Sequence, residues 1–251
     1  MALLSQLING IQIGSIYALV ALGYSMVYGI VKLINFAHGD LIMVGAYVCY
    51  VLIARLAVPA FAAIIISLLF CVALGVLIEK VAYKPLRDSA RISLLITAIG
   101  ISLLLQNLAQ LLFKADPRIF TNLFPGSQTV LGFTIGNVTI VTIVVSVVLM
   151  AALSVLVKTT KIGKAMRAGS EDKATAELMG IRVDTTISFT FALGSALAAV
   201  AAVLYICSYA QIEPTMGSML GLKAFVAAVL GGIGIIPGAV LGGFLIGIAE
   251  S

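Results

Sequence analysis

The sequence predicts an all-α integral membrane protein, a polytopic bundle of about seven or eight transmembrane helices in which some helices are short or broken. Composition is the first reason: 62% of the 251 residues are hydrophobic, 10% are charged, and the mean hydropathy is +1.20. Soluble domains carry about 25% charged residues. Length is the second reason, because six stretches without Asp, Glu, Lys or Arg reach the roughly 20 residues that cross a bilayer. One membrane domain over residues 1–251 is therefore the simplest organisation.

The predicted spans follow seven apolar runs. These are Leu3 to Val31, Leu41 to Ala54, Leu56 to Ile78, Ile92 to Phe113, a span within Thr129 to Val157, Thr185 to Ile212, and Ala224 to Ala249. Residues 1–9 lack the Lys or Arg of a cleavable leader, so the first run counts as a span. The chain stops at Ser251 directly after an apolar run, and we therefore expect that a final span is missing.

Lys and Arg predict the orientation, because in short loops they favour the cytoplasmic side. Eleven fall on one side of the predicted spans: Lys32, Lys80, Lys84, Arg87, Arg91, Lys158, Lys161, Lys164, Arg167, Lys173 and Arg182. Four fall on the other: Arg55, Lys114, Arg118 and Lys223. We expect an outward N-terminus and a long cytoplasmic loop over residues 158–184. The net charge of +5 is then a topology signal, and no nucleic-acid partner is expected.

Few residues are available for catalysis or for metal binding. His38 is the only histidine, and the three cysteines, Cys49, Cys71 and Cys207, lie in apolar runs without metal-ligand or redox spacing. No Gly-rich stretch leads into Lys and Ser or Thr at nucleotide-binding spacing. We expect no enzyme activity, metal or cofactor, and buried structural cysteines.

The first candidate site precedes the second run. Leu41 to Ala54 would cover only about 21 Å of a core that is roughly 30 Å thick. The preceding polar segment, with Asn35, His38, Gly39 and Asp40, must therefore lie near or within the membrane. Either it lines a translocation path, as short interrupted spans do in transporters, or it is an interfacial turn whose Asp40 caps the next helix.

The second candidate site interrupts the last run at residues 231–238, where Gly231, Gly232 and Gly234 stand close to Pro237. Non-helical backbone at membrane depth is tolerated only against protein or a water-filled cavity. The segment is either a broken or re-entrant helix that lines the path, or a tight packing seam of small residues.

A short amphipathic helix is predicted in the cytoplasmic loop. Ser170 would cap it, Glu171 and Asp172 would form an acidic first turn, and Gly180 would end it. Its apolar side would carry Ala174, Leu178 and Ile181, and its polar side Lys173 and Glu177. Such a helix suits the groove of a soluble partner or, alternatively, a membrane surface.

Several motifs in order resemble the LivH-type permease subunits of branched-chain amino acid ABC importers. They are Asn35-Phe36-Ala37-His38-Gly39-Asp40 with Gly45-Ala46-Tyr47, Tyr83-Lys84-Pro85-Leu86-Arg87, Ile99-Gly100 before Gln106-Asn107, Gly163-Lys164-Ala165-Met166-Arg167 to Met179-Gly180-Ile181, and Gly221-Leu222-Lys223-Ala224-Phe225 leading into Gly231-Gly232-Ile233-Gly234. The resemblance covers nearly the whole chain.

The resemblance implies a subunit that moves Leu, Ile, Val or similar small zwitterions by alternating access. Its partners would be a second related permease, two cytoplasmic ATPase subunits, a periplasmic binding protein and the lipid of a bacterial inner membrane. The family's coupling loop resembles the segment with Arg167, Glu171, Asp172, Ala174, Glu177, Leu178 and Gly180. Import of urea or short amides is the alternative within the fold, and an ion-coupled secondary transporter is the alternative from another class.

Overall fold

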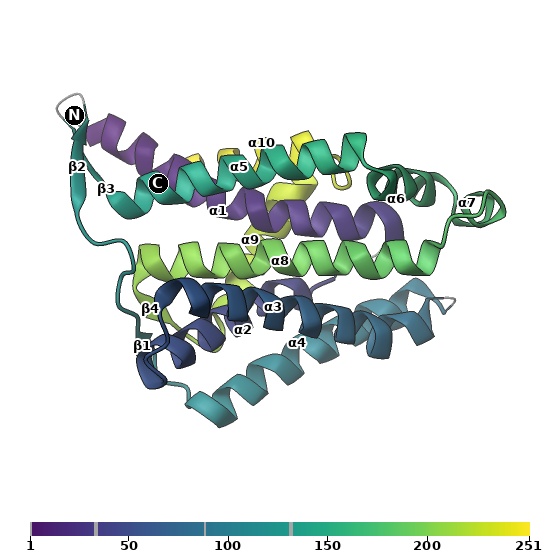
Figure 1. The fold of residues 1–251 in the computed structure, drawn as a ribbon, viewed down its shortest axis with the longest axis horizontal. Helices are drawn as coiled ribbons and strands as arrows, with labels where there is room; N and C mark the ends of the chain where they lie inside the picture. The colour runs from purple at the N-terminus through teal and green to yellow at the C-terminus, as the bar shows by residue number, and fades with distance from the viewer. Residues whose placement is uncertain (1, 33–34, 88, 131–132) are drawn as a thin grey trace.

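The structure, a computed structural model, describes residues 2–32, 35–87, 89–130 and 133–251 as a helical bundle (Figure 1). The helices are α1 Ala2–Val31, α2 Ala37–Tyr50, α3 Ala60–Ile78, α4 Arg91–Phe113, α5 Asn137–Thr159, α6 Lys161–Glu171, α7 Lys173–Leu178, α8 Val183–Tyr209, α9 Met216–Leu230 and α10 Ile236–Glu250. A π-helical segment, Val51–Arg55, extends α2; a π-helical segment, Glu79–Tyr83, and a 3₁₀ turn, Lys84–Leu86, extend α3.

Six helical segments in the described part of the chain are long and apolar enough to cross a membrane. They are Leu3–Val31, Ala37–Arg55, Ala60–Leu86, Ile92–Phe113, Asn137–Thr159 and Val183–Tyr209. The shorter apolar helices α9 and α10 have 15 residues each. Together they confirm the predicted polytopic helical membrane protein.

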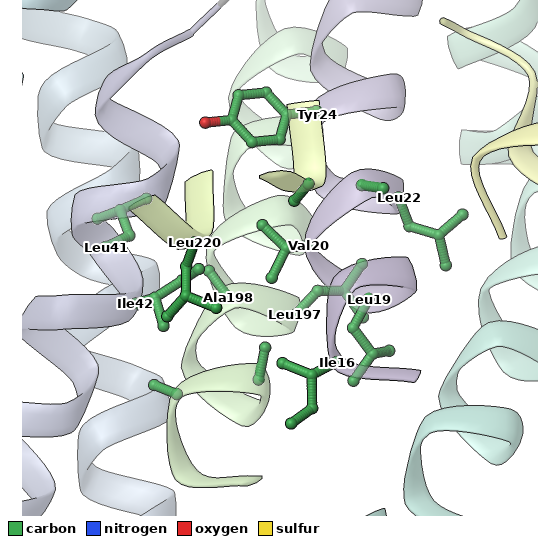
Figure 2. Packing of buried hydrophobic residues seen from close by; sticks show 14 of the residues in the cluster. Ile16, Leu19, Val20, Leu22, Tyr24, Leu41, Ile42, Leu197, Ala198 and Leu220 are labelled. Carbon is green, nitrogen blue, oxygen red and sulfur yellow. The ribbon is translucent and has the colours of Figure 1, made fainter. Parts of the chain in front are cut away.

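The core surrounds the middle of α1. Ile16 and Leu19 of α1 are buried in one cluster with Ile42 of α2, Leu197 of α8 and Leu220 of α9 (Figure 2). In the most apolar stretch of each helix, 83% of the α1 residues are buried, whereas the buried share is 22% for α3, 22% for α4 and 28% for α5. Apolar helix faces left open in this way suit a lipid environment, in which they need no protein cover.

Small residues bring α1 and α10 into close antiparallel contact. A Cβ atom added at Gly247 would lie 2.2 Å from Gly14 Cα, and one added at Gly243 would lie 2.5 Å from Ala18 Cα. Only glycine permits this approach, as in other membrane helix pairs that pack through small residues. The contact joins the first and the last helix of the chain.

Two small antiparallel sheets were not predicted. In the first, β1 (Arg118–Ile119) pairs with β4 (Gln211–Ile212); in the second, β2 (Ser127–Val130) pairs with β3 (Phe133–Gly136). They lie at the end of the bundle opposite α6 and α7 (Figure 1). Residues 114–128 thus contain β1 and the first two residues of β2, and β1 ties this segment to the connection after α8.

The last apolar run is broken, as one of the two alternatives predicted for residues 231–238 required. It forms two helices, α9 and α10, joined by a turn over residues 231–235. Lys223, which the charge count assigned to a loop, lies inside α9. A glycine-rich turn in the middle of the run reverses the chain, so that one run yields a helical hairpin.

Candidate functional site

Asn35 is held by the end of α3. Its side chain is buried, and its Oδ1 accepts a hydrogen bond of 2.7 Å from the Tyr83 hydroxyl. Helix α2 then begins at Ala37, before the predicted apolar run. With its π-helical extension to Arg55 the helical segment has 19 residues, or about 28 Å. The helical segment thus takes in His38 and Asp40 of the polar segment, in agreement with the expectation that the apolar run alone is too short.

His38 fills a tight space between helices. Its side chain is 2% exposed, and its ring meets the Tyr24 ring edge-on with centroids 4.9 Å apart. A Cβ atom added at Gly23 of α1 would lie 2.2 Å from His38 Nε2, and one at Gly194 of α8 would lie 3.4 Å from its Cε1. The two glycines make room for the imidazole, and the residue is packed rather than open to a cavity.

Asp40 is fully buried inside the first turn of α2. It is not the N-cap, which is Phe36, so the alternative of an Asp40-capped helix is wrong. Gln106 Nε2 of α4 donates to its Oδ1 at 3.0 Å, and Oδ2 has no hydrogen-bond partner among the described residues. An unpartnered carboxylate oxygen at this depth is costly and marks a site where a polar group is expected.

Gly39 lies where α2 meets the first half of α9. A Cβ atom added at Gly39 would lie 2.3 Å from the carbonyl oxygen of Gly217 and 2.8 Å from Gly221 Cα. The start of α2 is thus bound to the first half of α9. The second candidate site follows the other end of α9, so the structure does not bring the two groups of candidate residues into direct contact.

The break between α9 and α10 combines both predicted alternatives. Gly232 and Gly234 have φ of +88° and +92°, values that only glycine adopts readily. A Cβ atom added at Gly231 would lie 1.8 Å from the Gly238 carbonyl oxygen, so the two helices also touch through backbone atoms. The segment is a true helix break and a tight packing seam at once.

The loop over residues 158–184 holds two helices where one was predicted. Thr160 caps α6 through a 3.0 Å bond from the Gly163 amide. Asp172 caps α7 and accepts from the amides of Ala174 and Thr175 at 2.9 and 3.3 Å. The predicted cap, Ser170, instead donates to the Arg167 carbonyl within α6. Hydrogen bonds from the Thr175 side chain and backbone hold the pKa of Asp172 below its usual range.

The exposed surface of α7 includes Ala174 and Leu178, two residues of the predicted apolar side. The buried residue is Ala176, whereas Ala174 and Glu177 are exposed. Leu178 is 88% exposed and Met179 is 80% exposed. Gly180 has φ of +83° and ends the helix as predicted. Two large apolar side chains without cover at a helix end are typical of a docking point.

One small cavity lies between α6 and the break that separates α9 from α10. Arg167 and Ser170 of α6 line it with Gly234 of the helix break and with Ser25 and Gly29 of α1. The buried Ser25 hydroxyl has no hydrogen-bond partner in the described part of the chain. Helix α6 thus lies beside both the end of α1 and the α9–α10 turn.

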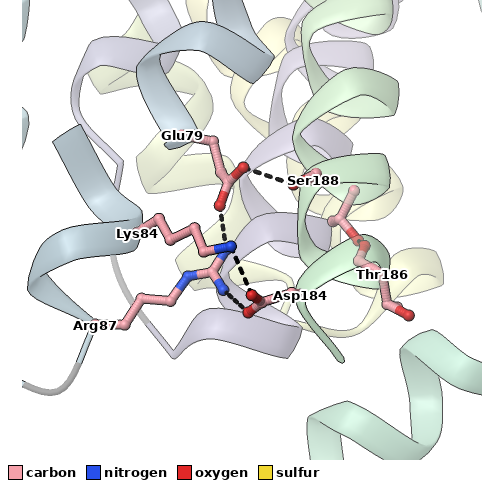
Figure 3. Close-up of polar contacts among 7 residues, drawn as sticks. Glu79, Lys84, Arg87, Asp184, Thr186 and Ser188 are labelled. Atoms are coloured by element: carbon pink, nitrogen blue, oxygen red, sulfur yellow. Dashed lines mark hydrogen bonds and ion pairs between the residues drawn. The ribbon is translucent and has the colours of Figure 1, made fainter. Parts of the chain in front are cut away.

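Sequence reasoning missed a polar cluster between the end of α3 and the start of α8 (Figure 3). Arg87 bonds to both Glu79 and Asp184. Ser188 Oγ donates to Glu79 Oε2 at 2.6 Å, and Lys84 Nζ lies 2.7 Å from Asp184 Oδ2. The basic residues were read as a topology signal and as part of a family motif and were not paired with an acid, although the acidic Glu79 at the end of an apolar run was an available clue.

The comparisons with known proteins agree with the resemblance. A family model described as the branched-chain amino acid transport system permease component matches residues 6–251. The chain is 44% identical to the high-affinity branched-chain amino acid transport system permease protein BraD of Pseudomonas aeruginosa, and 43% identical to the corresponding protein LivH of Escherichia coli K12. Each alignment covers 99% of this chain and 85% of the relative.

A more distant relative is the probable branched-chain amino acid transport permease protein LivH of Methanocaldococcus jannaschii, at 31% identity over 94% of this chain and 76% of the relative. No solved structure matches the chain. A match over nearly the whole length, together with a multi-pass helical bundle, establishes the assignment. The chain belongs to the family of branched-chain amino acid transport permease components.

Proposed function

We propose that this chain forms the transmembrane path of an ATP-driven importer for Leu, Ile, Val or similar small zwitterions. The observation that carries the proposal is the 44% identity to BraD over 99% of the chain. The chain has no nucleotide-binding Gly-rich motif of its own, so the energy comes from partner ATPases. It acts in a bacterial inner membrane with its N-terminus outside, beside a second related permease and a periplasmic binding protein.

In this proposal α6 and α7 receive the motion of the ATPases. The exposed side chains of Leu178 and Met179 would enter a groove of the soluble partner. Helix α6 would pass the displacement on, because its Arg167 lines the cavity shared with Gly234 and α1. The cavity that α6 and the helix break line together supports this route.

The start of α2 is the second moving part. Asn35 is bonded to Tyr83, and the end of α3 is tied to α8 by the polar cluster. Helix α8 begins five residues after α7 ends. A displacement of α7 can therefore reach Asn35, and through it the start of α2, by way of the short connection to α8 and these hydrogen bonds.

Reconstitution tests the function. The chain, purified with its neighbouring permease and ATPase subunits, is placed in proteoliposomes and supplied with loaded binding protein. We expect uptake of labelled leucine that requires ATP and persists when an uncoupler removes ion gradients. Competition by excess isoleucine or valine, but not by urea or acetamide, is the expected specificity.

Two outcomes would contradict the proposal. Uptake that collapses with the uncoupler while ATP is held constant would make the chain an ion-coupled carrier. Uptake of urea in place of leucine would change the substrate class while leaving the ATP-driven mechanism intact.

A further inference from the structure

An apolar groove of about 510 Å³ lies between α3 and α4, with α2 at its base. Met43 and Tyr47 of α2 are buried there, whereas Phe70 of α3 and Leu112 of α4 are 49% and 71% exposed. Helix α4 lies at the edge of the bundle (Figure 1). The groove therefore opens on the outer surface of the bundle, and its volume is that of a site for a ligand.

The lining of the groove differs from a seam between packed helices. Fourteen described residues line it, and Ala109 is the only small one among them. Where helices of this chain approach closely, glycines form the contact, as Gly14 and Gly247 do between α1 and α10. Membrane helices generally pack through small residues. Bulky apolar side chains around an open groove therefore favour a flexible hydrocarbon chain over a helix of another subunit.

One end of the groove holds two buried polar groups that lack a partner. Tyr47 stacks on Phe113 with ring centroids 4.3 Å apart, and its hydroxyl has no hydrogen-bond partner in the described part of the chain. Arg118 Nη2 donates to the Phe113 carbonyl at 2.8 Å, but its Nε has no partner among the same residues. Buried tyrosine hydroxyls usually find a partner. A ligand that fits this end must therefore offer hydrogen-bond acceptors.

Basic residues gather at the same end. They are Arg55, Lys114 and Arg118, three of the four Lys and Arg residues on the sparsely charged side of the predicted spans. The Arg55 guanidinium lies 5.8 Å from the centroid of the Phe113 ring, and none of the three forms an ion pair with another described residue. Two exposed acids, Asp116 and Glu213, lie on the neighbouring connections. Three cations with two acids leave a net positive charge at this end.

We propose that the groove binds an anionic phospholipid, with one acyl chain between α3 and α4 and the phosphate beside Arg55 and Arg118. The two guanidinium groups neutralise the phosphate, and the Tyr47 hydroxyl donates to a phosphate or ester oxygen. The proposal requires a chain that spans a membrane, which the six long apolar helical segments supply. It is independent of the transported substrate.

The bound lipid supports the position of α4. Gln106 of α4 donates to Asp40 Oδ1 at 3.0 Å, and Leu105 and Ala109 on either side of Gln106 line the groove. An acyl chain in the groove therefore packs against the helix that supplies this hydrogen bond. Occupancy of the groove is linked in this way to the buried carboxylate at the start of α2.

Photolabelling tests the site in the purified complex with its partner subunits, held in phosphatidylcholine nanodiscs. The two probes are phosphatidylglycerol and phosphatidylcholine with the same diazirine on one acyl chain. We expect phosphatidylglycerol to label the peptides with Phe70 and Leu108 more strongly, relative to the similarly open α5, than phosphatidylcholine does. Unlabelled phosphatidylglycerol should compete, whereas glycerol phosphate, which lacks acyl chains, should not. This comparison needs no variant, so it holds even if substitutions disturb assembly.

Matched variants separate the headgroup contacts from packing. We expect Arg55→Gln to lower the preference for phosphatidylglycerol about fivefold, the factor that one basic residue contributes at an anionic membrane surface. The control, Lys161→Gln at the start of α6, should leave the preference unchanged. Tyr47→Phe should also lower it, and added phosphatidylglycerol should raise the Tm of this variant less than that of the wild type. Removal of an unpartnered hydroxyl would not by itself weaken the response to lipid.

Three results would overturn the proposal. An equal pattern of label from the two probes would mean that lipid covers the bundle without selecting the groove. Absence of label from α3 and α4 in the intact complex would mean that another subunit covers the groove. Full preference for phosphatidylglycerol in both Arg55→Gln and Tyr47→Phe would exclude the headgroup contacts. None of these results bears on ATP-driven uptake, which the reconstitution tests separately.

Discussion

Removal of Arg87 is expected to destabilise the protein strongly. Arg87 neutralises Glu79, whose side chain is fully buried and has the Ser188 hydroxyl as its other partner among the described residues. Truncating one member of a buried ion pair leaves an uncompensated charge and costs about 3–5 kcal/mol. Arg87→Met should therefore lower the free energy of unfolding by roughly that amount, with the lower end favoured because Arg87 is 12% exposed.

The companion variants give the expected order. Glu79→Gln leaves Arg87 with Asp184, which is 57% exposed, so its cost should be smaller, about 1–2 kcal/mol. The double variant removes both charges of the buried pair and should be more stable than Arg87→Met alone. Positive coupling of this kind is the signature of an ion pair rather than of packing.

Buried cysteines allow the unfolding of these variants to be measured. Cys49, Cys71 and Cys207 are free and buried, so a fluorogenic thiol dye reacts with them only when the chain opens. Thermal unfolding in detergent, followed with this dye, should rank the variants. A double variant as unstable as the sum of the two single variants, or an unperturbed Arg87→Met, would refute the reasoning.

The remaining predictions concern orientation, coupling and packing. New cysteines at Thr121 or Asn122 should react with an impermeant reagent in intact cells, whereas one at Lys161 should not; the reverse pattern would invert the orientation. Asp172→Ala should weaken co-purification of the ATPase subunits. The Asp172 pKa is lowered, so at neutral pH its carboxylate is ionised and caps α7 fully. The cap is lost as the pH falls through that lowered pKa, and the protection of the α7 amides from hydrogen exchange should fall with it. Gly180→Val should cost roughly 1–2 kcal/mol and uncouple ATP hydrolysis from uptake, whereas Gly180→Asn should be milder; equal uptake by both would contradict the left-handed cap. Gly243→Val should abolish assembly by separating α1 and α10, which size-exclusion chromatography would report.

The sequence was sufficient for the parts of the fold that depend on local composition. Apolar length located the spans, because crossing a bilayer requires a fixed number of helical residues. The motif around residues 231–238 predicted the helix break correctly, since consecutive glycines and a proline weaken any helix. Gly180 likewise predicted the end of α7.

Contacts between residues far apart in the sequence were not predictable from a single sequence. Lys223 was read as a loop residue because its partner, Glu250, follows 27 positions later. The same limit hid the Arg87 contact with Asp184, which spans 97 positions, and the pairing of β1 with β4. The burial of His38 depends on Gly23 and Gly194, whose small size has meaning only when three helices are assembled.

The contact between α1 and α10 has a consequence for biosynthesis. Gly14 and Gly247 touch, although 233 positions separate them. At a translation rate of about 5–20 residues per second, Gly14 waits on the order of 10 to 50 s for its partner. During that interval the glycine face of α1 has no native cover in the bilayer. Helix α1 must therefore remain accessible within the membrane until the α9–α10 hairpin inserts, and a chaperone or insertase that shields a small-residue helix face would act during that interval.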